Sequence, residues 1–319
     1  MDNWNLRYIQ LHITVQWQED GIVPVHKESA FRGSMGEYLL RQNCIADRKC
    51  EACSFEEDCI VRKIFYAKYK IVPPAVQTES AGFVMYCPDT RKQIRAGDRT
   101  TLELTLFGNV ILYFSQILSA LYAAGYHGIF SSQSKYEIKK ITTRQGAEIL
   151  QGNDIHMEQY NYEYLRDYIT ERMEALGYSP MQYEYQSLSP KPVLRLCFDS
   201  PAVLKYKNDL MKEFDEDTVT GVLNSIVRKV KMYLNYEGIP SPDYIVRADD
   251  YQYLAAQSQY ITYFRHASTE KERQPLRGVT GSIDLKIQSA ELLEYMLAGE
   301  LLQIGKSTKF GMGKYHILW

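Results

Sequence analysis

The chain has 319 residues, of which 45% are hydrophobic, and a formal net charge of −2 at pH 7. Its length exceeds the usual size of one domain, so two domains that share an interface are the first expectation. The near-zero charge counts against a protein that binds nucleic acid over its whole surface. No apolar run is long enough to span a membrane and the N-terminus lacks the pattern of a signal peptide, which predicts a cytoplasmic protein without a membrane partner.

The first half of the chain alternates strand and helix patterns. Residues 6–17 place apolar side chains at every second position, which is typical of a half-buried strand. The elements predicted after it are a helix at 29–42, strands at 81–86 and 101–107, a helix at 109–124 and a strand at 135–143. This order is β-α-β-β-α-β, the ferredoxin-like motif.

The second half repeats the order. Its predicted elements are a strand at 193–198, a helix at 218–234, strands at 258–265 and 279–287, a helix at 289–298 and a last strand that ends at Trp319. Two such passes predict an α+β chain of tandem ferredoxin-like domains, with boundaries at 1–146 and 191–319. Residues 147–190 between them are expected to form a tyrosine-rich helix and a linker.

Four cysteines lie close together in the first half, as an insertion at 44–59. Cys44, Cys50, Cys53 and Cys59 form a C-x5-C-x2-C-x5-C pattern. Two thiols spaced by x2 can reach one ion, and four can close a tetrahedral site, so zinc is the leading expectation and an Fe–S cluster the second. The alternative is a set of reduced cysteines without a metal. In either case the segment is expected to be structural.

The end of the chain interleaves glycines with lysines. Glycine lets a backbone adopt positive φ and be approached closely, and lysine supplies charge for phosphate, so this loop is a candidate site for a nucleic-acid backbone. The residues assigned to that contact are Gly305, Lys306, Lys309, Gly311, Gly313 and Lys314. The alternative is an ordinary turn with solvated lysines. The run from Gly305 to Ser307 lacks the earlier glycine of a Walker loop, so no nucleotide cofactor is expected.

These features resemble a known family. The run IGKSTKFGMGKY at 304–315, after VTGSIDL at 279–285, is similar to the glycine-rich signature of the CRISPR-associated RAMP endoribonucleases that process precursor crRNA, the Cas-six family. The run FRGSMG at 31–36, the cysteine segment, Leu106-Phe107-Gly108 and a helix that ends at Gly125 follow in the family's order. The resemblance implies tandem ferredoxin-like domains of RAMP type.

It also implies a reaction: attack of a ribose 2′-OH on the adjacent phosphate, which leaves a 2′,3′-cyclic phosphate and a 5′-OH without a catalytic cofactor. That chemistry needs a proton-transfer group near neutral pH and a cation for the developing charge. His26 lies where many members carry a catalytic histidine, and Lys27 and Arg32 are assigned to charge stabilisation or phosphate contact. His12 and His316 are the alternatives to His26.

The resemblance leaves more than one function open. The first is an endoribonuclease that binds and cleaves CRISPR repeat RNA, with CRISPR effector complex subunits as further partners. The second is a catalytically inactive RAMP subunit that binds crRNA within an effector complex. The third is a metal-stabilised module in which the cysteine segment binds another protein.

Overall fold

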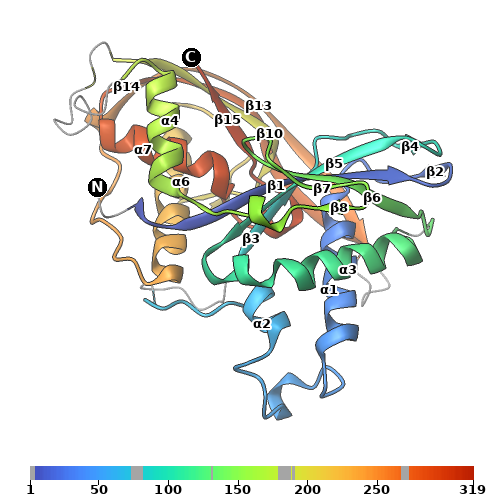
Figure 1. Ribbon diagram of the computed structural model, residues 1–319. Coiled ribbons are helices and arrows are strands. Elements are labelled where there is room, and N and C mark those ends of the chain that lie inside the picture. Colours follow the sequence, from blue (N-terminus) through green and yellow to red (C-terminus); the bar gives the residue numbers. More distant parts are fainter. Residues whose placement is uncertain (1–3, 73–81, 131, 179–187, 189–190, 267–272) are drawn as a thin grey trace.

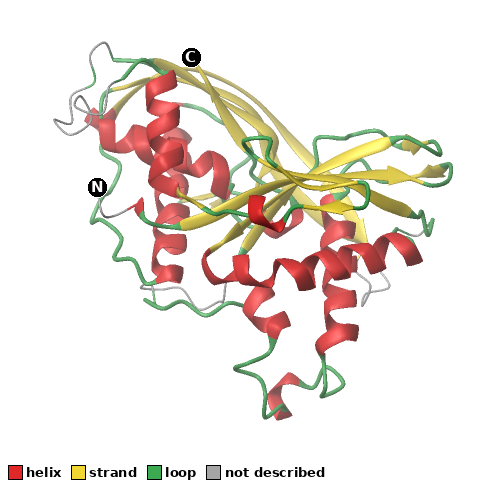
Figure 2. Ribbon diagram, in the orientation of Figure 1, coloured by secondary structure: helices red, strands yellow, loops and turns green. Residues whose placement is uncertain are grey.

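The computed structural model describes residues 4–72, 82–130, 132–178, 188, 191–266 and 273–319. Within them the chain forms two large antiparallel sheets, with helices packed against them, and two small two-stranded sheets (Figures 1 and 2). The side chains of 265, 266 and 273 also lie outside the description, as does the predicted linker at 179–190 apart from Leu188. No helix in the described part of the chain combines the length and apolar composition that a membrane crossing requires.

Strand β1 (Arg7–Trp17) lies inside the first sheet, and from Leu11 to Trp17 alternate side chains along it are buried. It pairs antiparallel with β5 (Arg99–Phe107) on one side and with β6 (Tyr136–Thr143) on the other. Strand β3 (Phe83–Tyr86) pairs with β5, which gives the order β3-β5-β1-β6. This is the order of a ferredoxin-like unit.

Two helices cover one face of the first sheet. Helix α1 (Glu28–Asn43) buries Phe31, Met35 and Leu39 at the spacing that the sequence indicates. Helix α3 (Phe114–His127) packs beside it. The helix predicted from residue 109 begins instead with the 3-10 turn η3 (Gly108–Tyr113). These elements enclose a hydrophobic core that belongs to the first half alone.

Short strands extend the first sheet beyond β6, the last strand that the sequence predicts for it. Strands β7 (Glu148–Gln151) and β8 (Asp154–Ile155) continue the sheet from β6, and β9 (Glu163–Tyr164) pairs with the start of β1. The sequence pattern predicts none of them, because two to four residues carry too few alternations to stand out. Helix α4 (Leu165–Ala175), in the predicted tyrosine-rich segment, buries four of its hydrophobic residues.

The remaining small elements of the first half lie at its ends and turns. They are β2 (Gly21–Ile22), which pairs with β4 (Gln93–Ile94), and η2 (Cys50–Ala52), α2 (Ile60–Phe65) and η4 (Met157–Gln159). Figure 1 shows that the chain between α1 and α2, which carries the cysteines, projects away from both sheets.

The second sheet repeats the arrangement. Strand β10 (Val193–Ala202) pairs with β14 (Arg273–Ile287) and with β15 (Tyr315–Leu318), and β13 (Tyr251–His266) pairs with β14. The order β13-β14-β10-β15 is again that of a ferredoxin-like unit, so the predicted fold class is confirmed. Strand β13 begins seven residues before its predicted start, which makes a long hairpin with β14.

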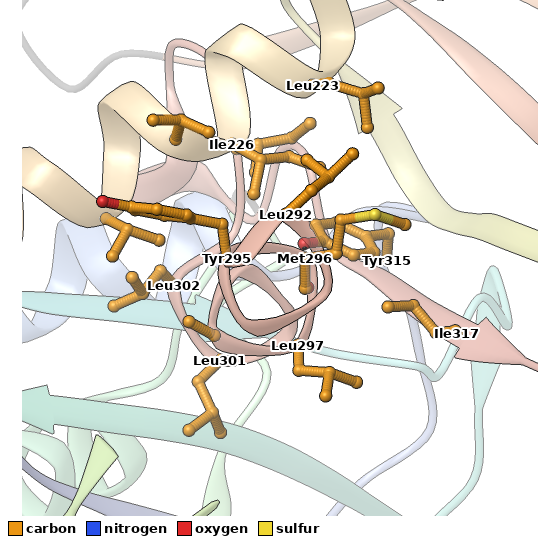
Figure 3. Packing of buried hydrophobic residues seen from close by; sticks show 14 of the residues in the cluster. Leu223, Ile226, Leu292, Tyr295, Met296, Leu297, Leu301, Leu302, Tyr315 and Ile317 are labelled. Carbon is orange, nitrogen blue, oxygen red and sulfur yellow. Dashed lines mark hydrogen bonds between the residues drawn. The ribbon is translucent and has the colours of Figure 1, made fainter. Parts of the chain in front are cut away.

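Two helices complete the second unit. Helix α6 (Glu216–Glu237) begins with a capping box at Asp215 and ends at Gly238, where φ is +78°. Helix α7 (Ala290–Leu302) is buried almost throughout (Figure 3), because α4, α6 and the sheet all pack around it. The smaller elements are β11 (Lys205–Tyr206), β12 (Asp209–Leu210), η5 (Ala248–Asp250) and η6 (Thr308–Phe310).

The two halves share a second hydrophobic core. It includes Tyr8, Val84 and Phe107 from the first sheet together with most of the apolar residues of the second half. The rings of Phe107 and Tyr233 lie with their centroids 4.5 Å apart across this junction. The halves therefore form one packed body.

Candidate functional site

The candidate histidine lies where the two halves meet. His26 belongs to the segment between β2 and α1, and its imidazole stacks on the ring of Tyr263 in β13, with centroids 3.9 Å apart and planes inclined by 24°. Burial, and then the charge of Lys27, lower the pKa of His26 below its ordinary value of 6.5. A neutral imidazole at pH 7 can accept a proton, which is the requirement for a general base.

Lys27 lies next to the histidine but points into the protein. Its side chain is fully buried, and Nζ donates to the backbone oxygens of Asp89 at 2.6 Å and Arg91 at 2.8 Å. The ammonium also lies 3.7 Å from Oδ1 of Asp89. This arrangement fastens the start of α1 to the loop before β4. It argues against the direct contact with RNA that the sequence suggests for Lys27.

Arg32 also has a structural environment. Its guanidinium carbon lies 4.7 Å from the ring centroid of Phe65 in α2 and 5.2 Å from that of Phe310 in η6. Cation–π contacts of this kind stabilise a half-buried arginine. Arg32 thus joins α1 to the glycine loop, defined as residues 303–314, and brings a positive charge beneath it.

A buried carboxyl group lies one residue after Lys27. Glu28 Oε1 accepts a hydrogen bond of 3.1 Å from the backbone N–H of Cys87, while Oε2 has no hydrogen-bond partner among the described residues. Burial raises the pKa of Glu28 to about 7. The carboxyl packs against Gly311, where an added Cβ would lie 2.6 Å from Glu28 Cγ. Sequence reasoning missed Glu28 and Tyr263, because no local pattern marks either residue.

The glycines of the glycine loop are required by packing. Gly305, Gly311 and Gly313 have φ of +77°, +83° and +75°, a region that favours glycine. A Cβ at Gly313 would lie 1.9 Å from the backbone oxygen of Ile304. The N–H groups of Gly311 and Gly313 donate to backbone oxygens at 3.0 Å, the latter to Pro201. Those two amides are therefore engaged within the protein.

The three lysines of the glycine loop differ in exposure. Lys306 is exposed. Lys309 is half-buried, with Nζ 5.9 Å from the ring centroid of Tyr66. Lys314 Nζ donates to the backbone oxygen of Glu300 at 3.1 Å and lies 3.4 Å from Glu103 Oε2, so it ties the loop to the first sheet. The surface charge of the loop thus comes chiefly from Lys306.

A fourth lysine supports the loop from below. Lys229 in α6 is buried, and its Nζ donates to Thr308 Oγ1 at 2.9 Å. Burial lowers the pKa of Lys229 to about 8. The interior of the second half therefore holds a cation directly under η6.

The alternative histidines lie on the two sheets, each near Lys314. His12 alternates with the buried residues of β1, so it faces away from α1 and α3, and its cross-strand partner is Glu103. His316 Nδ1 lies 2.8 Å from Oδ1 of Asp199 on the second sheet. The sequence-predicted group of His26, Arg32 and the glycine loop is brought together at the junction. Both alternative histidines are linked to Lys314 of that loop, His12 through Glu103 and His316 through Asp199.

The four cysteines line one cavity of about 650 Å³ between α1 and α2. The backbone N–H of Arg48 donates to Cys44 Sγ at 3.2 Å, which orients this sulfur within the segment. Number and type of donors thus fit a structural zinc ion. The described residues contain no group of three or more ligands already gathered around a point, so the segment would have to close around the metal.

Two family models match different parts of the chain. A family model named AF_1859_N, described as an N-terminal domain, matches residues 6–163, and the model of the CRISPR-associated endoribonuclease Cas6 matches residues 196–315. No curated protein matches the sequence. The fold is a tandem ferredoxin-like arrangement, and the chain resembles the Cas6 family, whose model matches its second half.

Solved structures show the same fold at low sequence identity. A partial Cas6-RT-Cas1–Cas2 complex aligns with a TM-score of 0.56 and 13% identity over 98% of this chain, which spans 46% of that longer chain. Cas6 of Thermus thermophilus aligns with a TM-score of 0.50 and 14% identity, over 98% of this chain and 99% of that one. A Cas6 product complex gives a TM-score of 0.50 and 14% identity, with 98% and 100% covered.

Proposed function

We propose that this protein is an endoribonuclease that binds and cleaves CRISPR repeat RNA. The single observation that carries the proposal is the position of His26, held at the junction of the halves beside the glycine loop of a Cas6-like second half. The coarser statement, a role in CRISPR RNA processing, is supported by the family model and by the fold.

In the proposed reaction the neutral imidazole of His26 accepts the proton of a ribose 2′-OH as its oxygen bonds to the adjacent phosphorus. The bond from phosphorus to the 5′-oxygen breaks, and that oxygen takes up a proton. The products are a 2′,3′-cyclic phosphate and a 5′-OH. No step needs a metal ion, because the imidazole generates the nucleophile and the cationic side chains offset the charge of the pentavalent state.

The cationic side chains have separate tasks in this proposal. Lys306, the exposed lysine of the loop, contacts the RNA backbone directly. Arg32 and Lys229 lie beneath the loop and contribute positive potential from inside the protein. A buried charge acts through a low dielectric and is therefore less screened than a surface charge.

Cleavage of end-labelled repeat RNA tests the proposal. We expect one discrete cut in the presence of chelator, and no cut in a substrate with a 2′-deoxy nucleotide at that position. His26→Ala should abolish cleavage and retain RNA binding, while His156→Ala, which removes an exposed histidine beside Glu158, should leave both unchanged. Normal cleavage by His26→Ala would remove His26 from the mechanism and turn attention to His12 and His316.

The second candidate is a catalytically inactive subunit that binds crRNA within an effector complex. Lys27, a cation predicted to stabilise the developing charge, is engaged inside the protein, and this favours it. Tight binding of repeat RNA without any cut would establish this function in place of the first.

We also propose that Cys44, Cys50, Cys53 and Cys59 hold one structural metal ion, with zinc preferred over an Fe–S cluster. All four line one cavity, and none of the residues from 44 to 60 is buried. A segment without a core of its own needs another source of order, and a metal–thiolate site supplies it. The metal takes no part in the reaction.

A further inference from the structure

The imidazole of His26 is supported by a residue from the other half of the chain. The imidazole of His26 stacks on the ring of Tyr263. Among the described residues, none forms a hydrogen bond with either ring nitrogen of His26. An imidazole on a loop between two elements, without a hydrogen bond to fix its ring, depends on such packing for its orientation.

Tyr263 is itself held in place. Its hydroxyl donates to Sδ of Met312, a fully buried residue of the glycine loop. Its backbone pairs with Leu276 across the β13–β14 hairpin. Burial raises the pKa of Tyr263 far above its ordinary value, so the phenol keeps its proton and remains a donor. The stack therefore rests on a ring that the hairpin and the glycine loop both fix.

We propose that Tyr263 is a positioning residue for His26: its ring fixes the plane of the imidazole and shields one face of it from water. The expected effect of Tyr263 on RNA cleavage rests on the proposed function. The expected effect on the orientation and pKa of His26 does not, because the stack exists in the protein without RNA.

The charged and titratable groups around the histidine set the expected effect. Lys27 lies immediately before α1, and its charge lowers the pKa of His26. Glu28 is the first residue of α1. Asp89 and Arg91 belong to the loop that receives Lys27. Since burial is the largest cause of the lowered pKa of His26, loss of the Tyr263 ring should let water in and raise that pKa toward about 6.5.

The test is an NMR titration of histidine-labelled protein without RNA, with His26→Ala to assign the signal. Tyr263→Ala should raise the pKa of His26 by about half a unit or more, whereas Tyr263→Phe keeps the ring and should leave it unchanged. Phe264→Ala is the matched control, because this neighbouring aromatic residue is 58% exposed and alternates to the other face of β13. If Tyr263→Ala does not fold, Tyr263→Leu replaces it.

An equal pKa in the wild type and in Tyr263→Ala, or an equal shift in Phe264→Ala, would overturn the proposal. Single-turnover cleavage gives the second readout: Tyr263→Ala should slow the cut about ten- to hundredfold and move the acidic limb of the pH–rate profile upward, with Tyr263→Phe near wild type. If no variant and no wild type cleaves RNA, the proposed function fails, and the titration still decides the role of Tyr263.

Discussion

The glycine loop and the cysteine segment are irregular stretches of similar length that the structure holds in different ways. The glycine loop lies between the halves, with Gly311, Met312 and Gly313 buried and its backbone bonded to neighbouring segments. The cysteine segment projects from the fold, and no residue from 44 to 60 is buried. The comparison teaches that packing determines the conformation of the glycine loop. The cysteine segment has only the chemistry of its side chains to determine its conformation.

The largest effect is expected from the tightest contact of the glycine loop. Gly313→Ala should destabilise the protein by about 3 kcal/mol or more, because its Cβ would overlap the backbone oxygen of Ile304 at a positive φ. Gly33→Ala in α1 is the control: a Cβ there meets nothing within 4 Å, and alanine should stabilise the helix slightly. Equal unfolding midpoints for both variants would contradict the claim that packing specifies the glycine loop.

The second effect concerns the carboxyl group under Gly311. A pKa of about 7 in the folded state, against about 4.3 in the unfolded chain, means that the folded protein binds the extra proton between these values. Stability is therefore lost as pH rises through that window. Glu28→Gln should gain up to about 3 kcal/mol over the wild type at pH 8, and little at pH 4.

Denaturant unfolding at both pH values measures this difference. Burial also raises the pKa of Glu294 to about 7. The contribution of Glu294 cancels when the free energy of unfolding of the wild type is subtracted from that of Glu28→Gln at the same pH. A gain that is the same at pH 4 and pH 8 would contradict this, because it would show that the pKa of Glu28 is the same in the folded and the unfolded protein.

A smaller and local effect is expected when the cysteine segment loses its metal. Chelation, or replacement of Cys50 and Cys53 by serine, should increase proteolytic cleavage within 44–59 and leave the global unfolding midpoint within about 1 kcal/mol of the untreated protein. Cys197→Ser, on β10, is the control. Elemental analysis with less than about half an equivalent of any metal, in protein purified without chelator, would contradict the proposed site.

The smallest effect separates the lysines of the glycine loop. Lys306→Ala should reduce the slope of log K against log salt for RNA binding by about one, the loss of one phosphate contact. Lys314→Ala should change the slope less, because that ammonium is paired with Glu103. A triple alanine variant at Lys306, Lys309 and Lys314 with the wild-type slope would exclude the loop from the interface.

Much of the fold follows from local sequence pattern. The alternation in β1 and the spacing of Phe31, Met35 and Leu39 report directly on which side chains are buried, so the β-α-β-β-α-β order can be predicted twice. The start of β13 could not be predicted as well. Residues 252, 254, 255 and 257 of that start are exposed, and the strand is defined there by its hydrogen bonds to β14 rather than by burial.

The candidate site is less predictable than the fold. The position of His26 could be proposed from its neighbourhood in the sequence, but its partner Tyr263 could not, since it is one of 26 tyrosines and lies in the other half. The inward direction of Lys27 depends on the carbonyl groups of Asp89 and Arg91, which no pattern around residue 27 indicates. Long-range partners of this kind are decided by packing, which single-sequence patterns do not encode.

The shared core limits how the chain can be divided. Each half carries a complete ferredoxin-like order of strands, yet Tyr8, Val84 and Phe107 of the first half are buried by the second. Either half made alone would present this apolar surface to water and become prone to aggregation. The repeated architecture is therefore not modular: a recombinant exchange of one half between relatives would have to exchange the matching face of the other half with it.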